Sequence, residues 1–209
     1  MTLPAWVPPD ELKPAPEPLL LVQAFVNTRD LSLGTDLLTD ADAANQWLHQ
    51  CGLLAAEATA DAEDLRMARD VREGLRALIA NHGHGPAPTA GDLRPLREVA
   101  RSSRPRLGID PAGRIELDPG TGRLADGLAR LLLIIRDAQQ DGSWPRLKAC
   151  GNNDCRWAFY DRSHSRRGAW CRMASCGNLI KNRNLRARRS GQRRPAAGRP
   201  GAGRPRPVG

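Results

Sequence analysis

Two matched pairs of cysteines constrain this chain more than any other feature of its sequence. Cys150 and Cys155 are separated by four residues, Cys171 and Cys176 are also separated by four, and fifteen residues lie between the pairs. Structural zinc sites take four ligands in tetrahedral geometry, and two cysteine pairs on two tight turns supply four thiolates. Because these thiolates fill the coordination shell, the pattern predicts a closed, structural Zn²⁺ rather than a catalytic ion.

Other uses of four cysteines fit the sequence less well. Two disulfides would suit a secreted protein, but the proline-rich and acidic first residues are not a secretory signal. Iron–sulfur clusters more often use closely spaced cysteines, and four free thiols would be prone to oxidation. We interpret His164, the one histidine nearby, as a solvated turn residue, and the distant Cys51 as a small core residue.

The residues around the cysteines predict a small metal-supported unit. Residues 157–160 are typical of a strand, 161–168 of a polar turn, and 169–170 of the returning strand. After the second pair, residues 179–189 predict a short exposed helix of mostly basic and polar positions. This order of turn, hairpin, turn and helix is treble-clef-like. So small a unit lacks a core, so metal binding would supply much of its folding free energy.

The same stretch resembles the CGNR-type zinc finger. The residues that carry the resemblance are Cys150, Cys155, Trp157, Phe159, Asp161, Ser163, Trp170-Cys171-Arg172-Met173 and Cys176-Gly177-Asn178. In bacterial stress-induced transcription regulators this finger follows an ABATE domain, to which residues 25–30 are similar. One departure is that Leu179 stands where the family has arginine. If that arginine contacts nucleic acid, Lys181 or Arg183 would have to replace it.

The charge of the chain is unevenly distributed. Residues 1–145 carry 15 Lys+Arg and 21 Asp+Glu, a net charge of −6, whereas residues 146–209 carry 17 and 2, a net charge of +15. A basic module on an acidic body favours a polyanion as partner, and arginine suits phosphate and guanine contacts. No apolar run is long enough to cross a bilayer, so we expect a cytoplasmic protein and no membrane partner.

We expect the finger to bind duplex DNA and the protein to act as a transcription regulator. Most contacts should be to phosphates and only one or two to base edges. The candidate residues are Arg162, Arg166 and Arg167 on the turn, and Lys181, Arg183, Arg186, Arg188 and Arg189 on or after the last helix.

Two alternatives stay open. The protein could bind RNA or the ribosome, with Trp157, Phe159 and Tyr160 stacking on bases, although in so small a unit these side chains fit a miniature core better. It could instead be a redox-sensing interaction module that releases zinc on thiol oxidation. An enzyme is not expected, since the sequence shows no nucleophile–base pair and no open metal site.

The region before the finger predicts mostly helices. Residues 40–50 and 61–81 fit helices that begin after Thr39 and at Asp61, and residues 89–102 and 124–139 fit two more. Residues 106–109 and 114–117 alternate around a Pro/Gly turn and predict a β-hairpin. Apolar content alone does not decide between strand and helix for residues 19–28. In the 61–81 helix we expect Arg66, Arg69, Arg72 and Arg76 to form a solvated, ion-paired face.

The expected fold class is mainly α with a small β-hairpin, followed by a treble-clef-like zinc finger. The expected segments are a flexible proline-rich lead at 1–18, an ABATE-like domain at 19–143, a CGNR-like four-cysteine finger at 144–189, and a disordered Arg/Gly/Pro tail at 190–209. The ABATE-like domain would form a homodimer or sense an effector. Asn27 and Asp30 could line a small effector pocket, but we favour their interpretation as capping or turn residues.

Overall fold

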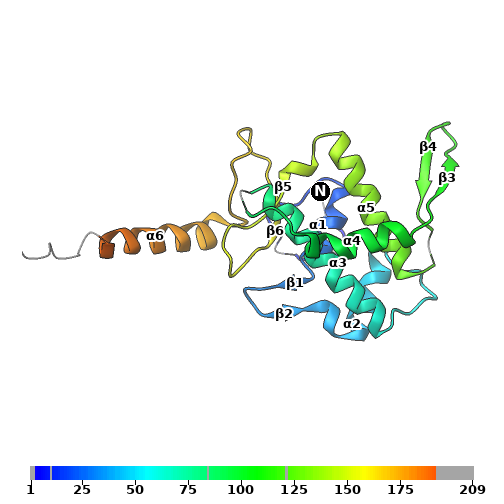
Figure 1. Ribbon diagram of the computed structural model, residues 1–209, viewed down its shortest axis with the longest axis horizontal. Helices are drawn as coiled ribbons and strands as arrows, with labels where there is room; N and C mark the ends of the chain where they lie inside the picture. The colour runs from blue at the N-terminus through cyan, green and yellow to red at the C-terminus, as the bar shows by residue number, and fades with distance from the viewer. Residues whose placement is uncertain (1–2, 10, 84, 121, 192–209) are drawn as a thin grey trace, which may run out of the picture.

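The computed structural model describes residues 3–9, 11–83, 85–120 and 122–191. The tail predicted as disordered lies outside these residues beyond residue 191. In the described part, the body is mostly helical, with small hairpins, and the four-cysteine region follows it (Figure 1). The predicted fold class is confirmed in these terms.

The body is built from α1 (Leu19–Val26), α2 (Ala41–Gln50), α3 (Ala62–Asn81), α4 (Ala90–Ser102) and α5 (Leu124–Gln140), with the short 3-10 helix η1 (Leu37–Thr39). The segment that the sequence left undecided is therefore a helix. Every residue of α1 is buried, and this helix packs against α3 and α5. The one polar side chain of α1, Gln23, is satisfied in the interior, because it accepts the Ala15 N–H at 2.7 Å and donates to the Lys13 and Ala158 carbonyls at 3.2 Å.

Side-chain caps explain where the helices begin. Asp61 and Asp64 form a reciprocal capping box at the start of α3, and Thr89 and Asp92 form another at the start of α4. At α2 the cap is Asp40, whose carboxylate accepts the Ala43 N–H at 2.9 Å, and not Thr39 as expected. Trp47 and Leu48 of α2 are buried, as predicted.

Two arginines of α3 were predicted wrongly. Arg66 is exposed and pairs with Glu63 and Asp70, as the pattern indicated. Arg72 and Arg76, however, are fully buried, with 1% and 0% exposure. Burial of a guanidinium is tolerated only when its donors are satisfied. Asp36 pairs with Arg72 at 2.6 Å, and Glu73 contacts both arginines at 3.1 Å.

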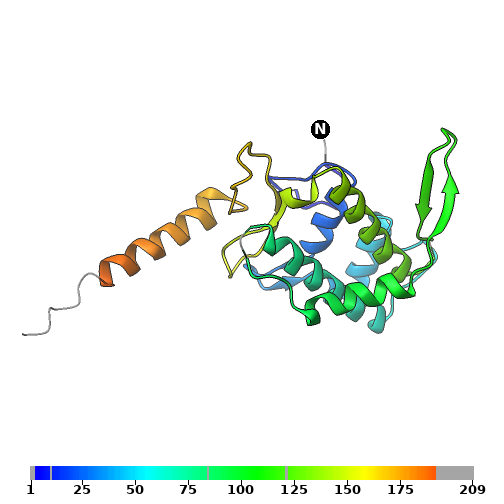
Figure 2. The ribbon, with the colours of Figure 1, turned by 45° about the horizontal axis from the view of Figure 1, so that its top comes forward.

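The hairpins differ in their surroundings. The first consists of β1 (Arg29–Asp30) and β2 (Thr35–Asp36). The second, β3 (Arg106–Ile109) and β4 (Ile115–Asp118), is the hairpin that the sequence predicted, and it projects from one end of the body in both views (Figures 1 and 2). The third, β5 (Leu147–Ala149) and β6 (Ala158–Tyr160), is completely buried.

The third hairpin joins the cysteine region to the body. Its residues Leu147 and Ala158 belong to the main apolar core, as does Trp144 of the preceding 3-10 helix η2 (Trp144–Arg146). The boundary predicted at residue 144 thus lies within a continuous core. Residues 169–170 were predicted as the strand that returns to 157–160, which was wrong, because β6 pairs with β5 instead.

The segment predicted as a flexible lead packs on the body where it is described. Val7 and Ala15 are buried, the Lys13 carbonyl accepts the Tyr160 N–H at 2.9 Å, and the Lys13 ammonium donates to the Trp170 carbonyl at 2.7 Å. At the other end of the chain, the π-helical turn η3 (Met173–Gly177) leads into α6 (Asn178–Gly191), which extends away from the body on the side opposite the β3–β4 hairpin (Figures 1 and 2).

Candidate metal centre and nucleic-acid interface

Two turns hold the four cysteines. Cys150 directly follows β5, and its N–H donates to the Trp157 carbonyl at 2.9 Å, which continues the β5–β6 pairing. Asn152 then closes the first turn, because its carbonyl accepts the Cys155 N–H at 2.9 Å and its side chain donates to Cys176 Sγ at 3.7 Å. Cys171 precedes η3, and Cys176 lies within it. Asn152 therefore connects the two turns.

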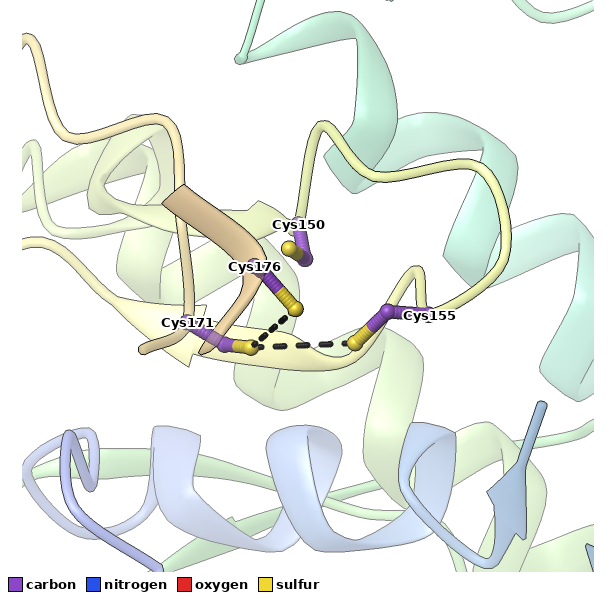
Figure 3. Close-up of side chains that lie close together, drawn as sticks. All are labelled: Cys150, Cys155, Cys171 and Cys176. Atoms are coloured by element: carbon purple, nitrogen blue, oxygen red, sulfur yellow. Dashed lines mark hydrogen bonds between the residues drawn. The ribbon is translucent and has the colours of Figure 1, made fainter. Parts of the chain in front are cut away.

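The four sulfur atoms converge on one point (Figure 3). All lie within 4.8 Å of one another, Cys155 Sγ and Cys171 Sγ are 3.7 Å apart, and Cys171 Sγ and Cys176 Sγ are 3.9 Å apart. A tetrahedron with Zn–S bonds of about 2.3 Å has edges of about 3.8 Å, so the donor set fits Zn²⁺. Cys150, Cys155 and Cys176 are buried, as suits a closed structural site.

The pKa values of the clustered thiols indicate that the four cysteines can all be thiolates only around a cation. Hydrogen bonds from the Cys155 and Cys171 thiols lower the pKa of Cys150 to about 2. The same hydrogen bond to Cys150 raises the pKa of Cys155 to about 12, and the hydrogen bonds to Cys150 and Cys155 raise the pKa of Cys171 far above its usual value. One thiolate is thus favoured and further ones are opposed. Four thiolates at this spacing require a metal ion, whose binding releases protons.

A buried ion pair fixes the loop 161–168. The Lys148 ammonium donates to Asp161 Oδ2 at 2.9 Å and to the Arg166 carbonyl at 2.5 Å, and both charged side chains are 5% exposed. Asp161 also accepts the N–H groups of Ser163 and Gly168 at 3.1 and 2.7 Å. Sequence reasoning missed Lys148. A lysine between apolar Leu147 and Ala149 is typical of a strand with one face in solvent, so its burial was not apparent from the sequence.

The loop presents its arginines outward. Arg162, Arg166 and Arg167 are exposed. Arg162 donates to the Pro14 carbonyl at 2.8 Å and lies 5.6 Å from the centre of the Tyr160 ring. The Arg166 backbone is left-handed, with a φ of 53°, which places its carbonyl against Lys148. His164 is exposed on this loop and is not among the clustered metal-binding side chains.

Helix α6 carries the remaining cations. Lys181, Arg183 and Arg186 are exposed, and Arg183 pairs with Asp154 of the first cysteine turn at 3.2 Å. Arg188 and Arg189 lie on α6, but their side chains are outside the described residues. The structure therefore brings the loop and α6 to the same end of the molecule (Figure 1).

Two of the three aromatic side chains of the finger are too buried to stack on bases. Phe159 is 0% exposed, with the Lys13 ammonium 4.8 Å from the centre of its ring, and Tyr160 is 8% exposed and belongs to the main apolar core. The Trp157 N–H donates to Glu11 Oε2 at 2.9 Å. Phe159 and Tyr160 are thus interior side chains, as the sequence favoured, whereas Trp157 is half-buried and lines the cavity described below.

Asn27 and Asp30 both line a cavity between the body and the cysteine cluster. Asn27 also clamps Ala158 of β6, because its amide donates to the Ala158 carbonyl at 2.9 Å and its oxygen accepts the Ala158 N–H at 2.7 Å. Asp30 Oδ1 closes the turn of the β1–β2 hairpin by accepting the Ser32 and Leu33 N–H groups at 2.7 and 3.1 Å.

A helical body joined to a four-thiolate centre places this chain in the class of zinc-finger proteins. Two family matches then identify the family. Residues 20–139 match the ABATE family, described as "Putative stress-induced transcription regulator", and residues 146–189 match the CGNR zinc finger. The chain thus belongs to the ABATE family and carries a CGNR zinc finger, as its sequence suggested. No curated protein matches it. Within the described residues, no helix combines the length and apolar content needed to span a membrane.

Proposed function

We propose that this transcription regulator binds duplex DNA through the end formed by loop 161–168 and helix α6. The observation that carries the proposal is that α6 extends into solvent with its described cations exposed, while the cysteine cluster holds its first turn. The major groove of B-DNA admits one α-helix, and α6, with 14 residues, is about 21 Å long.

The spacing on α6 assigns different roles to its residues. Leu179, Arg183 and Arg186 are four and then three residues apart, so they lie on one face of the helix. Lys181 lies on another face, where it suits a phosphate. In this arrangement Arg183 and Arg186 are the candidates for base edges, and the loop arginines position the duplex through its phosphates. The leucine at 179 removes one cation from the reading face.

For the helical body we propose self-association and the sensing of an effector. The β3–β4 hairpin supports the first role. Leu107 pairs with Leu117 and Ile109 with Ile115, so all four apolar side chains lie on one face of the hairpin. Leu107, Ile109 and Ile115 are 71–75% exposed. The face thus carries one apolar cross-strand pair at each of two positions along the hairpin. It can pack against the same face of a second molecule.

A salt titration of DNA affinity tests the main proposal. If six to eight cations contact phosphates, the logarithm of the affinity should fall with the logarithm of salt with a slope of roughly −5 to −7. The double variant Arg183→Ala/Arg186→Ala should weaken binding by about 100-fold, since two contacts of about 1–3 kcal/mol each are lost. Arg94→Ala, which removes an exposed arginine of α4, is the matched control and should bind normally. A slope near zero would remove the proposal.

A further inference from the structure

A cavity of about 850 Å³ lies where three separate parts of the chain meet. Its floor includes Asn27 and Thr28 at the end of α1, and its walls come from the N-terminal segment and the β1–β2 hairpin. Three of the metal-binding cysteines, Cys155, Cys171 and Cys176, line the remaining side. A molecule in this cavity would therefore contact the body and the metal centre at once.

Tryptophan side chains supply much of the apolar lining. Trp6, Trp47 and Trp157 all border the cavity. The Trp47 N–H donates to the Trp6 carbonyl at 2.9 Å, and the Trp157 N–H donates to Glu11 at 2.9 Å. Because these two N–H groups are already used, the rings offer a ligand carbon surface rather than hydrogen bonds. Electron-rich indole surfaces favour apolar bodies and organic cations.

The polar lining is rich in acceptors and negative charge. Glu11, Asp30 and Asp36 all border the cavity, and Arg72 neutralises only Asp36. The hydrogen bonds of Glu11 and Asp30 come from neutral donors, and those described for Asp30 all reach Oδ1, which leaves Oδ2 as an acceptor. A zinc ion held by four thiolates adds a formal charge of −2 beside them. Arg172 is the basic residue of the described lining.

From these observations we infer that the cavity binds a small organic cation, with an ammonium or amidinium group at Asp30 and Glu11 and an aromatic or alkyl body against the tryptophans. The inference deepens the sensing role proposed above. Because η3 carries Cys176 and leads directly into α6, a ligand packed on this turn acts on the base of the DNA-binding helix.

Three probes of one shape and different charge test this inference without DNA. They are phenethylamine, which is a cation at pH 7, neutral 2-phenylethanol, and anionic 3-phenylpropionate. In the zinc-loaded full chain, the five tryptophans give five indole N–H signals in ¹H–¹⁵N spectra. Phenethylamine should shift the signals of Trp6, Trp47 and Trp157. It should leave that of Trp144, which packs on His82 outside the cavity lining. Its affinity should exceed that of 2-phenylethanol about tenfold, and 3-phenylpropionate should bind weakest.

Conservative variants locate the charge. Asp30→Asn and Glu11→Gln keep an acceptor oxygen and should each weaken phenethylamine binding about fivefold, with 2-phenylethanol unaffected. Glu98→Gln, which changes an exposed carboxylate of α4, should have no effect. An unchanged Trp144 signal and retained zinc show that each variant is folded. Absent shifts, equal affinity for the alcohol, or an equal loss in Glu98→Gln would overturn the inference, while DNA binding would be untouched by that result.

Discussion

At the scale of single residues, the position of a charge in the helical repeat proved more informative than its residue type. Arg72 and Arg76 follow Ala68 at steps of four, and so they continue the buried side of α3. The sequence contained this signal, but arginines are rarely buried. Glu73 of the same helix pairs with both arginines, but their other partners, Asp36 and the carbonyls of Val26 and Arg156, are distant in sequence. Residue spacing does not reveal such partners.

The cysteines, in contrast, were predictable from the sequence. Four cysteines in two pairs fit one arrangement, a tetrahedral metal site, and the local turns can form this site without help from distant segments. The loop arginines were predictable as exposed, but the Lys148–Asp161 pair that supports them was not, because its two partners are thirteen residues apart on different elements.

Asp161→Asn should destabilise the protein by about 3 kcal/mol, because it leaves the Lys148 ammonium buried without its counter-charge. Thermal or urea unfolding of the zinc-loaded chain measures this loss. Asp154→Asn is the matched control, since Asp154 and Arg183 are both exposed and such pairs contribute little. Equal stability of the two variants would show that the buried pair does not hold the loop.

The carboxyl of Asp161 also gives the stability a pH dependence. Burial alone would raise its pKa, but hydrogen bonds from Lys148, Ser163 and Gly168 hold the pKa well below its usual range. A lowered folded-state pKa contributes stability above the unfolded value of about 3.9, and this stability is lost as the pH falls further. Unfolding at pH 5 and pH 3 should therefore show a smaller difference for Asp161→Asn than for the wild type.

Leu179→Arg should strengthen DNA binding, because it adds a cation one turn before Arg183 on the same face of α6. An additional cation at the DNA surface releases further counterions, so the salt slope should become more negative by about 1. Lys181→Arg keeps the charge on another face and serves as the control, with an unchanged slope. If Leu179→Arg leaves both affinity and slope as they are, the proposed reading face is incorrect.

At the scale of secondary-structure elements, the β3–β4 hairpin and α6 share one property: both extend from the body. The hairpin exposes apolar side chains and α6 exposes cations. The hairpin was predictable because its turn residues and its alternation agree. The pairing of β5 with β6 was not, because the apolar–charged–apolar order of residues 147–149 indicates a strand with one face in solvent, whereas all three residues are buried.

Ile109→Lys and Ile115→Lys should reduce self-association of the protein, because each places a charge on the apolar face of the hairpin. Four side chains are a small surface beside the roughly 1,200–2,000 Å² of stable interfaces, so we expect the wild type to associate weakly, in a concentration-dependent way. Sedimentation velocity over a range of concentrations measures this. Glu116→Lys, on the opposite face, should associate like the wild type. A wild type that stays monomeric throughout would refute the assignment.

At the scale of the whole molecule, two sources of stability lie side by side. The body and the β5–β6 hairpin share one apolar core, whereas the cysteine turns are held by little besides their ligands and two partly buried tryptophans. The sequence revealed both sources, but not that β5 and β6 share the core of the body, because the contacts involved join segments distant in sequence.

Removal of zinc with a chelator should therefore loosen one end of the molecule only. Amide hydrogen exchange should accelerate strongly over residues 150–156 and 171–191 and stay slow in α3, because the core of the body does not depend on the metal. Exchange should also stay slow in β6, which Asn27 clamps. Uniform acceleration along the chain would contradict this division.

The clamp of Asn27 and Gln23 on Ala158 has a consequence for how such proteins can change over time. If the finger were removed from this chain, the body would lose the part of its core that β5 and β6 supply, and β6 would lose its hydrogen bonds to α1 and Asn27. Recombination that swapped fingers between relatives would need to exchange α1 along with them. We therefore expect the two segments to be exchanged together, and not as interchangeable cassettes.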